Sequence, residues 1–447
     1  MNAKWLLTIL IFAGLVLGII AGQLLYDPGF SPGGVHAHAA ALALFDFIGF
    51  TVFMGLLKML IIPLIATSVI AGVTSVGDFS KLGALGARTL VYYFATMFMA
   101  VVLGLVLVTT FRPGDPMAAQ AAQVDNSGAA TGNDAEAANP PSSAPVPVDE
   151  RAQGGLIGIL KNLVSQMIPE NVVAAAAAGQ PLGIICFSIF FGVVATLVGA
   201  PAEPVVHFMN SAFEVLMRMV HVVMWIAPLG VFALLAKTIA VIGLQVFSEA
   251  IGRYMFVVLG GLAIHGLIVI PLVLWYFGKC NPFRFLHQMR QAMMTALATD
   301  SSSATLPVTI ECATEQGGVN KRSAGFVLPL GSTINMDGTA LYEAVAVVFI
   351  AQAFHIDLSF TELIIVAVTA TLAAMGAAGI PSAGLVTMII VIKAVNGSLT
   401  GHGAPEIPEA GIALIIGVDR LLDMFRTAVN VWGDAAGAKI IDRYDAK

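Results

Sequence analysis

Long apolar runs recur along the whole chain and are separated by short stretches that carry nearly all of its charge. Examples are residues 5–22 (WLLTILIFAGLVLGIIAG), 90–110, 254–277 and 340–354. A helix needs about 20 apolar residues to cross a bilayer, so the pattern predicts an all-α protein that crosses a membrane several times. Lys4 before the first run would also suit a signal peptide. That run continues past a typical signal core without a small-residue cleavage site, which favours a first membrane span.

The composition agrees with a membrane protein and does not suit a disulfide-rich or zinc-binding protein. Of the 447 residues, 58% are hydrophobic and 11% are charged, whereas soluble domains average about 25% charged residues. The three cysteines, Cys186, Cys280 and Cys312, are scattered, so the sequence predicts neither a disulfide framework nor a zinc site. The net charge of −6 carries little information, because the position of each charge relative to the spans sets the topology. We expect the lipid bilayer as a partner, and no nucleic acid.

The separation of basic from acidic residues predicts which ends of the spans face the cytoplasm. Residues 113–150 and 396–410 contain several acidic residues but no Lys or Arg. The basic residues cluster at other span ends: Lys81, Arg88, Lys279, Arg284, Arg290, Lys321, Arg322, Lys439, Arg443 and Lys447. The positive-inside rule places these clusters, and both chain termini, on the cytoplasmic side of the cell membrane. The Ala-, Pro- and Ser-rich segment 113–150 is expected to be a flexible extracellular loop.

Two apolar stretches begin and end on the same side of the membrane in this topology. They cover residues 292–318 and 363–395, and small residues with a proline interrupt them at 301–307 (SSSATLP) and 376–384 (GAAGIPSAG). We therefore predict two re-entrant hairpins, one from each face, because two ordinary kinked helices would need two further crossings. Irregular backbone at membrane depth is tolerated where protein or water supplies partners, and paired interrupted segments mark the substrate sites of transporters with inverted repeats.

A polar stripe follows one side of the last apolar segment. Asp419, Asp423, Arg426, Asn430 and Asp434 are spaced 4, 3, 4 and 4 residues apart, which places them within an arc of about 80° on a helix. An Asp or Arg at the centre of a span costs about 2.5–3.5 kcal/mol, so these groups must face partners or a polar cavity. Together the guanidinium and a carboxylate would suit a zwitterion with an acidic side chain. Alternatively, the acids and arginines of this helix satisfy one another.

A second polar segment, GSTINMDGTALYEAV at 331–345, places Asn335, Asp337, Thr339 and Glu343 in one span. Amide and carboxylate oxygens, together with carbonyls freed by local unwinding, are the hard ligands that suit Na⁺. An isolated Glu within a span is a candidate proton carrier. The alternative for Glu343 is a core residue with a permanent hydrogen bond.

These motifs resemble those of the dicarboxylate/amino acid:cation symporters, the glutamate transporter family. The resemblance covers nearly the whole chain except the loop near 113–153, and four motifs in the family's order make it specific. They are TDSSSATLPVT (299–309), GSTINMDGTALYEAV (331–345), GAAGIPSAGLVTM (376–388) and DRLLDMFRTAVNVWGD (419–434), with further likeness in FMGLLKMLIIPLIATSVIAG (53–72) and RTLVYYFAT (88–96).

The resemblance implies a homotrimer in which each protomer has about eight transmembrane helices, two re-entrant helical hairpins and inverted repeats. Scaffold helices would occupy 1–83 and 154–248, and the third span, 84–112, would join the mobile transport domain. The loop 113–153 would lie outside the cell, and 249–447 would form the rest of the transport domain. This domain would cross the membrane by an elevator-type movement with the second hairpin as its gate. The activity implied is secondary active uptake of aspartate or glutamate with Na⁺, and no further cofactor.

The resemblance also assigns roles to individual positions. The substrate would be held by Ser301, Ser302, Thr339, Ile380, Gly384, Asp423, Arg426, Thr427 and Asn430. One Na⁺ site would use Gly331, Asn335, Asn430 and Asp434. A second would use Thr333, Met336 and the backbone of Ala374, Met375 and Ala377, and a third would use Tyr93, Thr96, Asn335 and Asp337.

Three positions bear on the coupling ions and on the site. Met97 stands where a hydroxyl residue is usual in the family, so the third Na⁺ site lacks one oxygen. Glu343 matches the residue linked to H⁺ coupling in the animal carriers. Asp300 stands where Ser or Arg is commoner, and we expect it to pair with Arg420 because their charges are opposite.

Other functions remain as alternatives at this point. Relatives that carry C4-dicarboxylates tend to lack the Asp, and those that carry neutral amino acids lack the Arg, so the presence of both Asp423 and Arg426 favours an acidic amino acid. A channel lined by the buried acids is a second alternative. An intramembrane enzyme is disfavoured, because the chain has neither a Gly two residues before Asp434 nor a G-x-S-x-G nucleophile motif.

Overall fold

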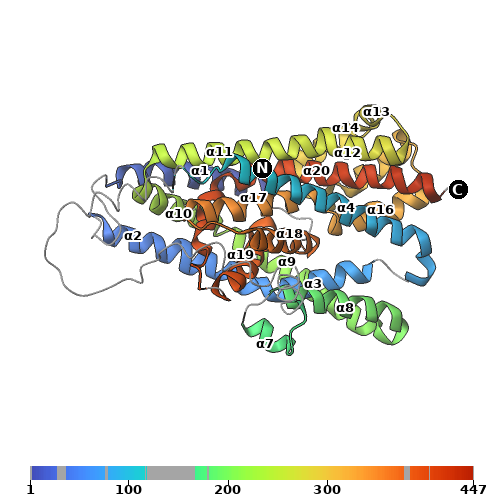
Figure 1. The fold of residues 1–447 in the computed structure, drawn as a ribbon, viewed down its shortest axis with the longest axis horizontal. Coiled ribbons are helices and arrows are strands. Elements are labelled where there is room, and N and C mark those ends of the chain that lie inside the picture. Colours follow the sequence, from blue (N-terminus) through green and yellow to red (C-terminus); the bar gives the residue numbers. More distant parts are fainter. Residues whose placement is uncertain are drawn as a thin grey trace.

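Long helices run roughly side by side along the longest axis of the protein (Figure 1). The computed structural model describes residues 3–27, 37–75, 79–115, 117, 167–178, 181–376, 383–401 and 403–445. Within these ranges the regular secondary structure is helical and no strand occurs.

The first half of the described chain contains α1 (Ala3–Leu24), α2 (Ala39–Asp46), the π-helical η1 (Phe47–Met54), α3 (Gly55–Ser75), α4 (Phe79–Phe111), α7 (Val172–Ala177), α8 (Pro181–Val198), η3 (Ala200–Ala202), α9 (Glu203–Met224) and α10 (Ala227–Ile242). The second half contains α11 (Leu244–Ile264), η4 (His265–Val269), α12 (Ile270–Val273), η5 (Leu274–Gly278), α13 (Pro282–Gln288), α14 (Arg290–Thr299), α15 (Ser302–Glu311), η6 (Cys312–Gln316), α16 (Lys321–Ile334), α17 (Asp337–Ala353), α18 (Phe360–Gly376), α19 (Ala383–Gly401), η7 (Glu409–Ile412) and α20 (Ala413–Asp445).

Three stretches of the described chain are long and apolar enough to cross a membrane: Leu85–Phe111, Leu244–Gly278 and Lys321–Ala353. Several shorter apolar helices accompany them, among them Gly183–Val198 and Ala227–Ile242. The prediction of an all-helical membrane protein is therefore confirmed at this level. Most of the predicted loop 113–153 lies outside the described residues.

The contact between α1 and α10 depends on glycine. A Cβ on Gly18 would lie 2.8 Å from the carbonyl oxygen of Phe232, and one on Gly22 would lie 2.8 Å from that of Ala236. Small residues at such spacing let two membrane helices approach backbone to backbone. This explains why the first apolar run carries glycines one helical turn apart.

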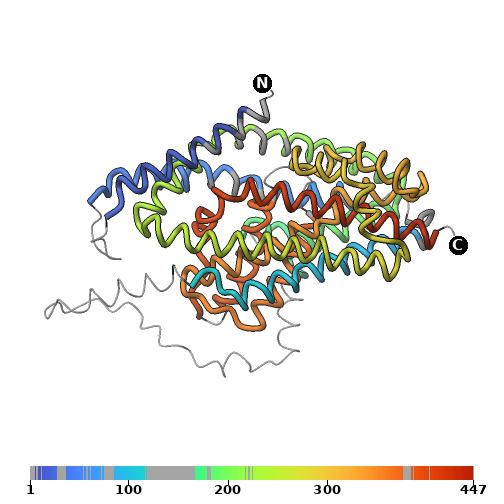
Figure 2. The backbone as a smooth tube through the Cα atoms, turned by 90° about the horizontal axis from the view of Figure 1, so that it is seen from above, coloured from blue at the N-terminus to red at the C-terminus, as the bar shows by residue number. Residues whose placement is uncertain are grey.

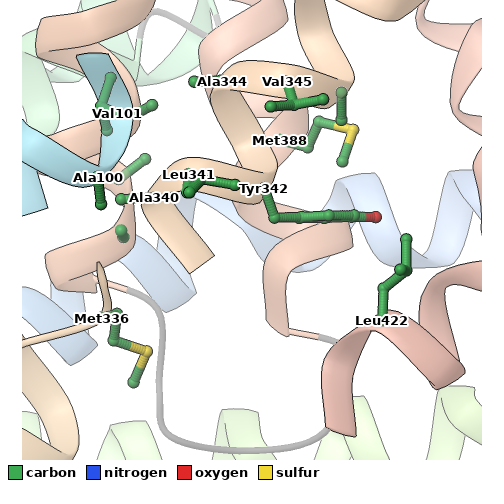
Figure 3. Close-up of a cluster of buried hydrophobic side chains, with 14 of the residues drawn as sticks. Ala100, Val101, Met336, Ala340, Leu341, Tyr342, Ala344, Val345, Met388 and Leu422 are labelled. Carbon is green, nitrogen blue, oxygen red and sulfur yellow. The ribbon is translucent and has the colours of Figure 1, made fainter. Parts of the chain in front are cut away.

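The centre of the bundle is α17, in which every residue is buried. It packs against α4, α11, α18, α19 and α20. In Figure 3, Tyr342 points from α17 toward Leu422 of α20, while Val345 lies close to Met388 of α19. The C-terminal helix α20, red in Figure 2, runs through the bundle and contacts α14, α15 and α16 as well as α17. The two polar segments of the sequence therefore lie on adjoining central helices.

Each stretch expected to form a hairpin consists of two packed helices. Helices α14 and α15 contact each other across a turn at Asp300 and Ser301, and α18 contacts α19. Residues 377–382, between α18 and α19, lie outside the described residues. The break between α14 and α15 falls at the start of the predicted interval 301–307. Ser301 caps α15 there by accepting a hydrogen bond from the Ala304 backbone amide (3.1 Å). Pro307 lies inside that helix.

Candidate functional site

The site is built around a break in a buried helix. Helix α16 ends at Ile334, Asn335 (φ −92°, ψ 88°) and Met336 (φ −116°, ψ 60°) are not helical, and α17 starts at Asp337. A break of this kind frees carbonyls at the end of one helix and amides at the start of the next. Negative charge is favoured near the amides and positive charge near the carbonyls.

Helix α20 covers the break with its polar stripe. Asn430 accepts a hydrogen bond from the Gly338 amide (2.7 Å), and its side-chain nitrogen lies 3.3 Å from the Thr339 hydroxyl. A Cβ at position 338 would lie 2.7 Å from the carbonyl oxygen of Arg426. Glycine in the NMDG segment therefore allows the start of α17 to approach the α20 backbone.

Arg426 lies at the centre of a buried charge cluster on α20. Its Nη2 lies 2.7 Å from an Asp423 carboxylate oxygen and 3.2 Å from one of Asp419, and its Cζ lies 3.8 Å from the centre of the Tyr342 ring. Arg426 itself is 0% exposed. The alternative in which charges of this helix pair with one another therefore holds for these three residues.

The pairing leaves part of the guanidinium unsatisfied. Nε and Nη1 of Arg426 have no hydrogen-bond partner among the described residues. Buried donors without acceptors are costly, so these nitrogens suit a carboxylate ligand. Gly384, at the start of α19, approaches the same group: a Cβ there would lie 2.7 Å from Nη1. The second hairpin therefore reaches Arg426. Ile380 lies outside the described residues.

The first hairpin reaches α20 through an ion pair. Arg420 Nη2 lies 2.5 Å from Asp300 Oδ2, which confirms the pairing expected from their opposite charges. Ser301 and Ser302, which follow Asp300 in the turn, are buried, as is Thr427 on α20. The turn between α14 and α15, the start of α19 and the start of α17 thus all approach the polar side of α20.

Two further carboxylates are buried below the helix break. Asp434 accepts a hydrogen bond from the side-chain amide of Asn335 (3.0 Å), and Asp337 Oδ2 lies 3.1 Å from His265 Nε2. Asp337 is 0% exposed and Asp434 is 2% exposed. Asp337 Oδ1 has no hydrogen-bond partner within the described residues. An amide does not cancel a carboxylate charge, and buried charges need compensation, so this pair fits a cation.

Residues of α4 supply additional oxygen atoms beside these carboxylates. The Thr96 hydroxyl lies 3.4 Å from Asn335 Oδ1, and the Tyr93 hydroxyl donates to the Val327 carbonyl (2.6 Å). Gly331 lies between Tyr93 and Asp434, because a Cβ there would meet oxygen atoms of both side chains. Met97 is 0% exposed and offers only a thioether. The structure therefore brings the residues assigned to the first and third Na⁺ sites into one polar cluster.

The residues assigned to the second Na⁺ site lie at the ends of two helices. Thr333 belongs to the last turn of α16, and its hydroxyl donates to the Leu330 carbonyl (3.1 Å). Met336 Sδ accepts a weak hydrogen bond from Thr339 (3.9 Å). Ala374 and Met375 belong to the last turn of α18, whose carbonyls have no partner within the helix. Ala377 lies outside the described residues.

Glu343 occupies the apolar core of α17 and is 0% exposed. The Thr387 hydroxyl of α19 donates a short hydrogen bond to its Oε1, whereas Oε2 has no partner among the described residues. The carboxyl group therefore joins α17 to the second hairpin by one contact that depends on the position of α19.

Three residues near the site were not identified from the sequence. Tyr342 stacks on Arg426, Thr387 binds Glu343, and His265 contacts Asp337. His265 could have been noticed, because an isolated ionisable residue in an apolar run is a candidate functional residue. The other two have no local signal, since a tyrosine or threonine in a buried helix is common.

Comparison with known proteins gives a consistent family. The family model described as "Sodium:dicarboxylate symporter family" matches residues 7–444. The chain is 39% identical over 466 residues to "Excitatory amino acid transporter 3" of Homo sapiens, which covers 97% of this chain and 84% of that protein. It is 39% identical over 468 residues to "Excitatory amino acid transporter 2" of Homo sapiens (98% and 78% covered). It is also 37% identical over 486 residues to "Excitatory amino acid transporter" of Caenorhabditis elegans (99% and 88% covered). The chain therefore belongs to the sodium:dicarboxylate symporter family.

Proposed function

We propose that the protein is a secondary active symporter that takes up aspartate or glutamate together with Na⁺. The observation that carries this proposal is the buried cluster of α20. Asp423 and Arg426 lie side by side, and Arg426 has donors without a partner among the described residues. A side-chain carboxylate of the substrate would bind the guanidinium, and its ammonium group would bind Asp423. The relatives named above are transporters of excitatory amino acids by their names, which supports the same substrate class.

The remaining substrate contacts would come from hydroxyl and amide groups around this cluster. Ser301 and Ser302 of the first hairpin, Thr339 of α17, and Thr427 and Asn430 of α20 would surround the α-carboxylate. Ile380 and Gly384 of the second hairpin would cover the substrate. Asn430 contacts both Gly338 and Thr339, so it would link the substrate to the cation cluster next to it.

Na⁺ would act as the coupling ion through the buried carboxylates and the carbonyls freed at the helix break. Asp337 and Asp434 place two acids in a region whose other polar groups are hydroxyl and amide oxygens, the ligands that hard cations prefer. H⁺ would be a second coupling ion through Glu343, whose contact with Thr387 joins the protonatable group to the second hairpin.

The architecture that suits this activity is the one predicted from the sequence. We propose about eight transmembrane helices with two re-entrant hairpins, both termini in the cytoplasm, and a homotrimer. Segments 1–83 and 154–248 would form a scaffold. Segment 84–112, together with 249–447, would form a transport domain that moves as an elevator. The contacts of α4 with α17 and of α20 with α14, α15, α16 and α17 support one such body.

The test is uptake of radiolabelled aspartate into proteoliposomes with Na⁺ and pH gradients imposed separately. We expect accumulation above equilibrium only when an inward Na⁺ gradient is present, because a symporter converts the ion gradient into substrate gradient. A channel lined by the same acids would equilibrate its solute without concentrating it. Equal uptake with and without Na⁺ would refute the proposal.

A further inference from the structure

An ion pair joins the turn between α14 and α15 to α20, on which both helices also pack. Arg420 Nη2 lies 2.5 Å from Asp300 Oδ2, and the side chains are 19% and 4% exposed. Asp300 ends α14 with a left-handed conformation (φ 49°, ψ 34°). Ser301 follows with an extended backbone (φ −148°, ψ 112°) and caps α15. The ion pair therefore holds the residue at which the chain reverses.

The side chain of Asp300 has a function beyond forming the turn. A left-handed backbone favours glycine, which adopts it without steric cost, and tolerates Asn and Asp. Glycine would therefore form this turn more easily than Asp, so what Asp300 contributes is its carboxylate, which binds Arg420.

The position of the pair connects the turn to the proposed substrate site. Arg420 precedes Asp423 by three residues, so the two lie about one helical turn apart on α20. On the hairpin side, Ser301 and Ser302 follow Asp300 directly. A fixed distance between Asp300 and Arg420 consequently sets the distance between these hydroxyls and the carboxylate of Asp423.

The charges around Asp300 and Arg420 favour contact between these two side chains. Asp300 lies within electrostatic reach of Asp423 and Asp419, which repel it, and of Arg420 and Arg426, which attract it. Arg426 is already shared between Asp419 and Asp423. If Arg420 were neutral, Asp300 would be a third carboxylate beside one arginine, and the turn would move away from α20.

We propose that Asp300 and Arg420 are a positioning pair that sets substrate affinity by holding the first-hairpin turn on α20 beside Asp423. This inference rests on the proposed function, because it names residues that shape the substrate site without contacting the substrate. The pair orients Ser301 and Ser302, and its loss weakens binding of the amino acid more than it slows translocation.

The experiment compares KM and Vmax for aspartate uptake in three variants: Asp300→Asn, Arg420→Gln and the double variant. Asn keeps the tolerance for a left-handed backbone, so Asp300→Asn removes only the charge. We expect each single variant to raise KM about tenfold, which is about 1.4 kcal/mol, with Vmax within about twofold. The double variant should be no worse than either single variant, since the effects of coupled residues are not additive.

A matched control comes from an ion pair of the same length on α11. Arg253 Nη2 lies 2.5 Å from Glu249 Oε1, and both side chains are about half exposed. Arg253→Gln should leave the KM for aspartate unchanged. Additive effects of the two single variants on KM would overturn the proposal while leaving the transport function intact. Absence of Na⁺-driven uptake in the unmodified protein would instead refute the proposed function.

Discussion

Replacement of Arg426 by cysteine tests the assignment of the substrate cluster. The arginine is 0% exposed, and it is shared by Asp423 at 2.7 Å and Asp419 at 3.2 Å. Its removal takes away the donors that we assign to the substrate carboxylate and leaves two buried acids without their counter-charge. We expect loss of aspartate uptake and acquisition of uptake of small neutral amino acids, because the pocket would then lack its cationic partner.

The size of the effect follows from these contacts. A hydrogen bond between ionised groups contributes about 1.5–3 kcal/mol, so loss of the guanidinium should weaken aspartate binding about 100-fold. Removing one partner from a buried ion pair typically destabilises a protein by about 3–5 kcal/mol. The variant should therefore unfold at a lower temperature than the unmodified protein, unless one of the acids takes up a proton.

The assay measures the Kd for aspartate by calorimetry in detergent, alongside thermal unfolding and uptake of labelled aspartate and alanine in proteoliposomes. Arg426→Lys is the matched control: it keeps the charge but loses the planar fork and the stacking on Tyr342, so it should lose part of the affinity. A folded cysteine variant with unchanged aspartate affinity would refute the role of Arg426.

Two further predictions concern the coupling ions. Glu343→Gln keeps a hydrogen-bond partner for Thr387 but cannot release a proton, so the pH dependence of aspartate uptake should disappear while Na⁺ dependence remains; pH dependence that persists unchanged would place H⁺ coupling elsewhere. Met97→Thr adds a hydroxyl oxygen in the polar cluster beside Thr96, so half-maximal uptake should require less Na⁺, about twofold to tenfold less if the oxygen contributes about one hydrogen bond's worth of binding energy. A Na⁺ requirement equal to that of the unmodified protein would mean that position 97 does not face the cation.

The sequence predicted the site well where periodicity carried the information. The spacing of Asp419, Asp423, Arg426, Asn430 and Asp434 placed them on one face of a helix, and the structure buries all five. The cost of burying charge in a membrane segment explains why this prediction is reliable, since such residues must find partners. The break at Asn335 and Met336 also agrees with the unwinding expected in the NMDG segment.

Partners that come from distant segments could not be derived in the same way. Thr387 lies 44 residues from Glu343, and His265 lies 72 residues from Asp337. Sequence periodicity gives the face of a helix but not the residue that it meets. The pairing of Asp300 with Arg420 was expected only from their opposite charges near the same site.

Proline did not mark the two described helix breaks at the site. Pro63, Pro307 and Pro329 all lie inside helices, whereas the breaks at Asp300–Ser301 and Asn335–Met336 contain none. Neighbouring helices in a membrane protein can satisfy the carbonyl that proline leaves free, so proline there does not have to end a helix. The side-chain cap of Ser301 and the close approach of Gly338 to α20 determine the breaks instead.

The linkage between Na⁺ and aspartate binding is the sharpest test of the proposed site, because the two ligands would occupy adjoining clusters joined by Asn430. The measurement is the Kd for aspartate as a function of Na⁺ concentration at constant ionic strength. We predict that raising Na⁺ tenfold below saturation lowers the Kd at least about tenfold, and that aspartate in turn raises the affinity for Na⁺, as reciprocal coupling requires. An aspartate Kd that does not change with Na⁺ would contradict the account.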